Sequence, residues 1–288
     1  MVSNKDYNPN LEDFEFLRSL PPIPQDTKEW KIFARPEEVD IDWHKTEDQK
    51  RMGSCTANGT TSAMERVFEV AGDLIQLSRI FMYLATQKLD GLLGRDSGST
   101  ISNAAKVALN GCPLESLTGY PSSYPNAAAR SKILAKEMYL AGEPYKMPKV
   151  WQVPQDYGKI LDFIGGGGAV AFGIRYYHGL IPSDRIIRDF SVRPRSGGHA
   201  MAVLGYTRDG ELRAVNSHAD GPYIITEKAW MKMLRDGFTS AVGFIGNDAK
   251  PVDWYKNSPY YKLKVKDNLD IVHPSDEPEK EEKEDKKD

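Results

Sequence analysis

Residues 49–68, QKRMGSCTANGTTSAMERVF, place a cysteine at the start of a helical pattern. Apolar side chains recur with the spacing i, i+3, i+4 and i+7 at Met64, Val67, Phe68 and Ala71. This spacing predicts a helix with one apolar face. A Gly-Ser pair at 53–54 precedes the pattern and is typical of the turn into a helix. The stretch therefore predicts a helix whose N-terminus carries Cys55.

A thiol at a helix N-terminus lies close to unpaired backbone N–H groups and to the positive end of the helix dipole. Both stabilise a thiolate, so we expect the pKa of Cys55 to fall well below the ~8.5 of a free cysteine. A buried and unreactive cysteine remains the alternative for this residue alone. A nucleophilic cysteine also needs a base, and histidine is the usual one.

The chain has five histidines, and one of them stands in a strand pattern. His44 lies in a charged stretch, where we expect it to be solvated, while His178 and His273 lie at a strand end and in the tail region. His199 opens the alternating run HAMAVLGY after two glycines. Asn216 ends the next predicted strand, after a turn that contains Asp-Gly. Pairing of these strands would bring Asn216 beside His199, although a core histidine and a turn asparagine remain alternatives.

Composition excludes several classes of protein. The chain has 288 residues, 40% of them hydrophobic, with a net charge of −3. Residues 274–288 hold eight acids and four lysines, so the rest of the chain carries about +1 and offers no basic block to nucleic acid. That acidic tail lacks aliphatic and aromatic side chains, and we expect it to be disordered.

The N-terminus and the cysteine content indicate a reducing compartment. Residues 1–17 are polar and acidic, unlike a secretory signal, and no run approaches the ~18 apolar residues of a membrane helix. Two cysteines allow at most one disulfide, which is not a disulfide framework. We therefore expect a cytoplasmic protein that has no membrane partner.

The pattern of predicted elements changes at about residue 150. Residues 55–142 read as helices, whereas β-type runs follow, one of them joined to its neighbour by the Asp-Gly turn. The glycines at 165–168 lead into a strand and lack the Gly-Lys-Ser/Thr of a phosphate loop. A helical half followed by an antiparallel half predicts an α+β fold with two lobes.

Five motifs occur in an order that resembles the papain-like cysteine peptidases, in particular a bacterial branch without a long pro-region. They are RPEEVDIDWHKTEDQKRMGSCTAN, LSRIFMYLATQKLDG, DSGSTISNAAKVALNGCP, GGHAMAVLGY and the Asn after the hairpin. The family places His and Asn ~130–150 residues after the cysteine. Here His199 follows by 144 residues and Asn216 by 161, slightly beyond that window. The resemblance covers about residues 35–246.

The resemblance implies a papain-like two-lobed fold with the active site between the lobes. It implies Cys55 as nucleophile, His199 as general base and then acid, and Asn216 as the residue that orients the imidazole. The side chain of Gln49 and the backbone N–H of Cys55 would form the oxyanion hole. The implied substrate-binding residues are Gly98, Ser99, Thr100, Gly198 and Ala200. A peptide or protein is the implied substrate, with no metal or cofactor, and we expect a monomer.

The chain departs from the family in two places. The family follows its Asn with Ser-Trp-Gly, whereas this chain reads NSHADGP, so His218 takes the place of the ring that shields the Asn–His hydrogen bond. We expect His218 to cap that pair in part, with a solvent-facing ring as the alternative. Met52 and Arg95 stand approximately where secreted relatives carry a disulfide, which fits a reducing compartment.

Two other functions compete with a peptidase. One is a Cys-His cell-wall amidase or endopeptidase, although such enzymes place His much closer to Cys. The other is a weak or inactive papain-like scaffold that binds a partner, for which the run NSHAD is the main support. We divide the chain into an N-terminal extension (1–34), a catalytic domain (35–246), an aromatic C-terminal strap (247–273) and the tail (274–288).

Overall fold

The computed structural model describes residues 11–22, 36–42, 44–45, 47–177, 182–190, 194–235 and 240–246. The predicted strap at 247–273, with Trp254, Tyr255, Tyr260 and Tyr261, lies outside the described residues, as does the predicted tail at 274–288. His178 and His273 lie outside them too.

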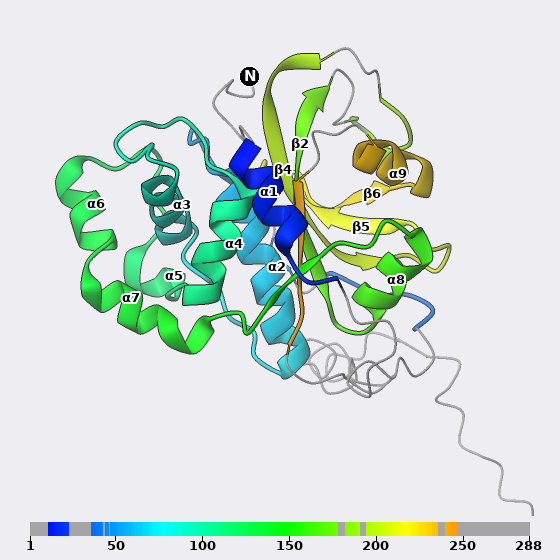
Figure 1. The fold of residues 1–288 in the computed structure, drawn as a ribbon, viewed down its shortest axis with the longest axis horizontal. Helices are drawn as coiled ribbons and strands as arrows, with labels where there is room; N and C mark the ends of the chain where they lie inside the picture. Colours follow the sequence, from blue (N-terminus) through cyan, green and yellow to red (C-terminus); the bar gives the residue numbers. More distant parts are fainter. Residues whose placement is uncertain are drawn as a thin grey trace, which may run out of the picture.

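The described residues form a helical half and a sheet half (Figure 1). The helices are α1 (Leu11–Ser19), α2 (Cys55–Ala71), α3 (Arg79–Leu89), α4 (Ile101–Asn110), α5 (Glu115–Thr118), α6 (Ala127–Ile133), α7 (Lys136–Gly142), the 3-10 turn η2 (Glu143–Tyr145), α8 (Tyr157–Gly165) and α9 (Glu227–Arg235). The strands are β1 (Val150–Gln152), β2 (Ala169–Tyr177), β3 (Ile186–Ile187), β4 (Pro194–Tyr206), β5 (Leu212–Val215), β6 (Tyr223–Ile225) and β7 (Ser240–Phe244). Helices α3 to α7 lie on one side of α2, and the sheet with α8 and α9 lies on the other. The predicted α+β fold is confirmed.

The sheet has the strand order β1-β7-β2-β4-β5-β6-β3. Every neighbouring pair is antiparallel except β3 and β6, which are parallel. The predicted antiparallel half is confirmed, and the short strand β3 adds one parallel pair at its edge. The predicted hairpin exists as β4 and β5, and its turn uses Gly210 with a φ of 78°.

Helix α2 packs against β2 and β4 and connects the two halves of the molecule. A Cβ on Gly59 would lie 2.9 Å from the backbone oxygen of Met201, so only glycine allows this close approach of helix to strand. Buried side chains of α2, α3 and α4 form one core with the facing side of the sheet, including Ala200 and Ala202. Met201 and Val203 belong to a second core under α8 and α9, as the alternation along a strand requires.

The described part of the N-terminal extension is packed against the rest of the fold. Helix α1 contacts α4 and β7, so it touches both halves. Leu17 and Leu20 join the core that contains α2. The backbone N–H of Gln152 donates to the oxygen of Pro21 at 3.0 Å, which places this segment beside β1. Residues 1–10 and 23–35 lie outside the described residues, and the predicted domain boundary at 34 stays a prediction.

Some elements escaped the sequence analysis. Helix α8 was not predicted, although Asp156 caps it by accepting from the N–H of Lys159 and its Ile160, Leu161 and Ile164 have a helical spacing. Strands β1 and β3 are too short to show a period. The end of the predicted helical region at 55–142 holds two short helices, since α6 ends at Ile133 and α7 begins at Lys136.

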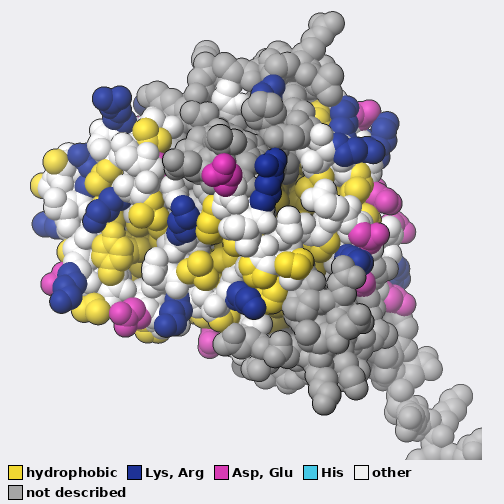
Figure 2. All heavy atoms as spheres, viewed as in Figure 1, with side chains coloured by type: hydrophobic (Ala, Val, Ile, Leu, Met, Phe, Trp, Pro, Cys, Tyr) yellow, Lys and Arg dark blue, Asp and Glu magenta, His cyan; other side chains and the backbone are white. Residues whose placement is uncertain are grey.

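In the described part of the chain, no helix is long and apolar enough to span a membrane. Figure 2 shows that Lys and Arg side chains lie singly over the helical half on the visible face, separated by polar and apolar groups. This distribution gives no continuous basic stripe on that half of the face.

Candidate active site

Cys55 is the first residue of α2, as predicted. The helix is capped by Ser54, whose side chain makes no capping hydrogen bond. Instead the Ser54 hydroxyl contacts the Tyr120 hydroxyl at 2.7 Å and accepts from the Asn58 amide at 3.2 Å. These contacts fix the turn that precedes the cysteine. The side chain of Cys55 is fully buried.

His199 lies on β4 opposite Ile174 of β2 and is also fully buried. Its Nε2 lies 2.7 Å from Oδ1 of Asn216, which follows β5. An amide oxygen only accepts, so Nε2 carries the proton and Nδ1 is the basic nitrogen. Burial, with a smaller contribution from the neighbouring His218, lowers the pKa of His199 to about 3, although the Asn216 contact acts in the opposite direction. The neutral imidazole is therefore the stable form here at neutral pH, because the site is desolvated.

Backbone pairing brings the segment before Cys55 to the segment that carries Asn216. The N–H of Gln49 donates to the oxygen of Ser217 at 2.7 Å, and the N–H of Ala219 donates to the oxygen of Glu47 at 2.8 Å. Gln49 lies six positions before Cys55, and α2 then packs along β4, which holds His199. The four predicted catalytic residues thus come from segments that contact one another in pairs.

The side chain of Gln49 is held at both ends. Its Oε1 accepts from the Ser217 hydroxyl at 2.5 Å, and its Nε2 donates to the backbone oxygen of Met52 at 2.8 Å. An amide nitrogen carries two hydrogens, so this arrangement uses one and leaves a second donor on a fixed group.

The predicted substrate-binding residues of the helical half form a buried turn before α4. Gly98 has a φ of 80°, a conformation that favours glycine, and its oxygen accepts from Gln87 at 3.1 Å. The backbone oxygen of Ser99 accepts from the Thr56 hydroxyl at 3.0 Å, which ties the turn to α2 one residue after Cys55. The Thr100 hydroxyl donates to Asp90 at 2.7 Å and caps α4.

The other two predicted substrate-binding residues, Gly198 and Ala200, flank His199 on β4. Both are buried, and they pair with Arg175 and Gly173 of β2. Ala200 belongs to the core that contains α2, and because side chains alternate along a strand, His199 and Ala200 point in different directions. Their part in substrate binding stays a prediction.

A carboxylate joins the loops where secreted relatives carry a disulfide. Asp96 Oδ1 accepts from the backbone N–H of Gly53 and from the Tyr83 hydroxyl, each at 2.8 Å. Both cysteines are free and buried. The hydrogen bond that Asp96 accepts from Gly53 therefore connects the loop before Cys55 with the loop before Gly98.

The ring of His218 stacks on the ring of His199, with centroids 4.7 Å apart and planes at 25°. This is the position from which a ring covers the Asn216–His199 pair, as the hypothesis for His218 requires. Its effect on a pH profile stays a prediction. The next acid, Asp220, accepts from Asn216 Nδ2 at 3.3 Å. The sequence analysis missed this contact, although the four-residue spacing from Asn216 was visible.

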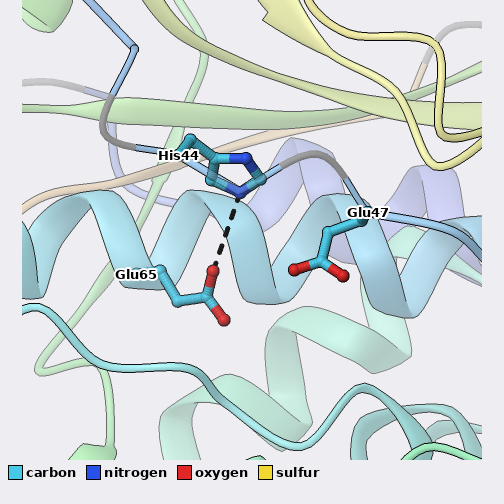
Figure 3. Close-up of side chains that lie close together, drawn as sticks. All are labelled: His44, Glu47 and Glu65. Atoms are coloured by element: carbon cyan, nitrogen blue, oxygen red, sulfur yellow. Dashed lines mark ion pairs between the residues drawn. The ribbon is translucent and has the colours of Figure 1, made fainter.

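Another buried histidine, His44, forms a cluster with Glu47 and Glu65 beside α2 (Figure 3). The side chain of His44 is only 2% exposed, so the expectation that it is solvated is wrong. Its Nε2 lies 3.7 Å from Oε2 of Glu65, and the Glu47 carboxylate points toward the same space. Burial and, to a smaller extent, the charge of Arg79 lower the pKa of His44 to about 4, and burial raises the pKa of Glu65 well above its usual value.

The three side chains offer ligand atoms within 4.8 Å of one another, as a metal site would. However, the guanidinium of Arg79 already pairs with Glu47, and it also pairs with Glu115 at 2.6 Å. Glu65 accepts from the backbone N–H of Leu77 at 2.8 Å. Because Arg79 supplies the positive charge that a metal would bring, we assign the cluster to the structure of the fold.

The fold matches those of solved cysteine proteases. Xylellain from Xylella fastidiosa superposes with a TM-score of 0.69 at 24% identity, over 85% of this chain and 96% of that protein. A procathepsin B from Trypanosoma congolense gives 0.60 at 18% identity, over 86% of this chain and 88% of its own length. A Carica candamarcensis cysteine protease in complex with E-64 gives 0.52 at 17% identity, over 74% and 99%.

No family model matches the chain, and no curated protein matches it by sequence. The structural likeness nevertheless extends over nearly the whole length of the proteins compared. The chain therefore has the papain-like fold that its sequence motifs predicted.

Proposed function

We propose that this chain is a cysteine peptidase, with Cys55 as the nucleophile and His199 as the base. The observation that carries the proposal is the 2.7 Å contact between His199 Nε2 and Asn216 Oδ1. That contact orients a basic Nδ1 on β4, the strand packed along the helix that begins with Cys55. Cysteine, base and orienting group are the three parts that nucleophilic catalysis by a thiol needs.

The proposed reaction has two stages. His199 Nδ1 takes the thiol proton, and the sulfur of Cys55 attacks the carbonyl carbon of the peptide. The C–N bond then breaks as His199 gives its proton to the leaving amine, which leaves a thioester on Cys55. A water molecule, deprotonated by His199, attacks the thioester, and the acid product and the thiol are released.

The oxyanion of each tetrahedral intermediate needs donors that are already in place. The proposal gives this role to the second hydrogen of Gln49 Nε2 and to the backbone N–H of Cys55. The support is that Gln49 is held by Ser217 and Met52, so it would not have to reorganise during the reaction.

The substrate is proposed to be a peptide or protein that binds against the turn at Gly98, Ser99 and Thr100 and beside Gly198 and Ala200. These residues are small and uncharged, so we infer a specificity pocket that accepts a sizeable apolar side chain. Cys55 and His199 are fully buried in this structure. Access by a substrate therefore requires a more open state. A monomeric, cytoplasmic enzyme without a cofactor remains our expectation.

Labelling by E-64 tests the proposal, because this epoxide was bound by the Carica protease. We expect one equivalent of E-64 on the full chain by intact mass, located on Cys55 by peptide mapping. Cys112 should stay unlabelled, because burial raises the pKa of its thiol and its Sγ contacts the oxygen of Ser78. The Cys55→Ala variant is the control. A chain that neither labels nor cleaves any member of a peptide library would contradict the proposal.

A non-catalytic scaffold is the second candidate, favoured by the complete burial of Cys55 and His199. Labelling without peptide cleavage, or absence of both, would support it. A cell-wall amidase has no supporting contact among the residues that the structure describes, and digestion of peptidoglycan would be the result in its favour.

A further inference from the structure

The side-chain amide of Asn216 has an acceptor or a donor on every side. Its Oδ1 contacts His199 Nε2 at 2.7 Å and accepts from the backbone N–H of Ser217 at 2.9 Å. Its Nδ2 lies 3.3 Å from Oδ2 of Asp220 and 3.3 Å from Nδ1 of His218. The orientation of this amide decides whether it can hold the proton on Nε2 of His199.

A rotation of the amide by 180° would reverse all four contacts. Its Nδ2 would then face the N–H groups of Ser217 and His199, and its Oδ1 would face the carboxylate of Asp220. Of the two groups that face Nδ2, the ring of His218 becomes a donor when it is protonated. A carboxylate only accepts, so on the Nδ2 side Asp220 constantly opposes the rotated amide, as the backbone N–H of Ser217 does on the Oδ1 side.

Asp220 is itself held in place. The Tyr223 hydroxyl donates to its Oδ2 at 2.5 Å, and Arg185 donates to its backbone oxygen at 2.8 Å. Its neighbours Ala219 and Gly221 have φ values of 58° and 78°, so the chain bends on both sides of it. This bend returns the carboxylate toward Asn216, four residues back.

The two oxygens of the Asp220 carboxylate have different surroundings. Within the described part of the chain, Oδ1 of Asp220 is buried and makes no hydrogen bond. Burial, followed by the contact with Asp220, raises the pKa of Tyr223, which keeps its hydroxyl a donor to the other oxygen.

We propose that Asp220 is a positioning residue that fixes the amide of Asn216 and, through it, the proton and ring orientation of His199. The inference rests on the proposed peptidase function. Within the run that replaces Ser-Trp-Gly, His218 covers the Asn216–His199 pair while Asp220 anchors the amide from the other side.

Kinetics of the full chain test the inference with a peptide substrate. The Asp220→Ala variant should lose about tenfold in kcat with KM changed less than about twofold, because a hydrogen bond that orients the base acts on the chemical step. The Asp220→Asn variant keeps an acceptor oxygen and should recover most of that loss. The Asp209→Ala variant removes an exposed acid from the β4–β5 turn and should match the wild type.

A double-mutant cycle separates an effect through Asn216 from a general loss of structure. In an Asn216→Ala background, Asp220→Ala should change kcat by less than about twofold. Equal losses in both backgrounds, or an unchanged kcat in the single variant, would overturn the inference. If Asp220→Ala does not fold, Tyr223→Phe replaces it in the cycle, since it removes the hydroxyl that holds Asp220 and should give a smaller loss with the same dependence on Asn216.

The behaviour of the wild type shows whether a negative result contradicts the peptidase proposal or only the role of Asp220. A wild type that neither labels with E-64 nor cleaves peptides contradicts the peptidase, and this inference with it. An active wild type whose Asp220 variants keep full kcat and the same pH profile contradicts only the role of Asp220.

Discussion

Two buried histidines, His199 and His44, have different surroundings. Burial lowers the pKa of both, to about 3 and about 4. His199 contacts neutral or acceptor groups in a run of hydrogen bonds that ends at Asp220, whereas His44 lies among carboxylates that Arg79 balances. One small hollow of about 230 Å³ is lined by residues from both regions, including His44 and Asn216.

The difference teaches which kind of buried polar group serves chemistry and which serves the fold. In the region of His199, the imidazole has a fixed orientation and a defined tautomer, and the ring of His218 stacks on one of its faces. The region of His44 has charge balance, with an Arg paired to two Glu and a Glu whose pKa is raised by burial. Substitutions in the first should change activity, and those in the second should change stability.

The largest expected effect is on activity. Cys55→Ala should lower kcat/KM by more than about 10³-fold, because the proposed nucleophile is lost while the proposed positioning groups remain. The melting temperature should change little, because the smaller side chain fits the same site at the helix start. Cys112→Ala is the matched control and should keep kcat/KM. Residual activity close to that of the wild type would remove Cys55 from the chemistry.

Arg79→Met should give the largest loss of stability. It leaves Glu47 and Glu115 without the guanidinium they share, and breaking a buried pair in this way costs about 3–5 kcal/mol. Arg188→Met is the control, because Arg188 pairs with Asp184 on the surface and should contribute less than about 1 kcal/mol. Urea unfolding measures both. Equal losses for the two variants would place Arg79 among ordinary surface pairs.

Gln49→Ala should lower kcat by about 10²-fold or more while KM changes little, since an oxyanion donor acts in the transition state. Gln49 belongs to the region of His199, because its side chain is held by Ser217, which is next to Asn216. Steady-state kinetics give both constants. A rise in KM without a fall in kcat would assign Gln49 to substrate binding.

The region of His44 should control acid stability. Its folded pKa is lowered, so below pH ~6.5 the unfolded chain takes up a proton that the folded chain refuses until about pH 4. The free energy of unfolding should therefore decrease as the pH is lowered through this window, by up to about 1.4 kcal/mol per pH unit for each such histidine. His199 contributes in the same direction.

The His44→Gln variant should consequently lose less stability than the wild type between pH 7 and pH 5, because one of these protons is removed. Glu65 acts in the opposite direction: its raised pKa makes stability fall as pH rises above about 4.5. Glu65→Gln should therefore give a steeper net fall toward acid pH. Melting temperatures across this range measure both slopes, and identical slopes for His44→Gln and the wild type would show that His44 titrates normally.

The smallest expected effect concerns His218. Burial lowers its pKa, and its positive form would face both His199 and the amide of Asn216. His218→Trp keeps a covering ring and removes this ionisation, so the acid limb of kcat/KM should move by less than about one pH unit. Identical acid limbs for the two proteins would leave His218 with a covering role only.

Local signals explain what could be predicted. The helix at Cys55 and the hairpin that joins His199 to Asn216 both follow from periodicity and turn residues within one segment. Helix α8 had such signals in Asp156 and its apolar spacing, but it is only nine residues long and runs into the glycines at 165–168. The strands β1 and β3 have three and two residues, too few for a period to show.

The surroundings of His44 could not be predicted, because they come from distant segments. Glu65 lies on α2, Glu47 in the preceding loop and Arg79 on the next helix, so no spacing along the chain relates their charges. The charged neighbours of His44 in sequence indicated solvent, whereas packing against α2 excludes solvent and brings opposite charges together.

The sequence by itself determined the papain-like fold, the position of Cys55 at a helix start and the pairing of His199 with Asn216. These depend on side-chain period, turn chemistry and motif order, all of which act over short stretches of chain. Only the tertiary structure decided that Gly59 lets α2 approach β4, that Arg79 balances the carboxylates and that Asp220 turns back to Asn216. Those outcomes depend on distances between segments and on exclusion of water, which arise only when the two halves pack together.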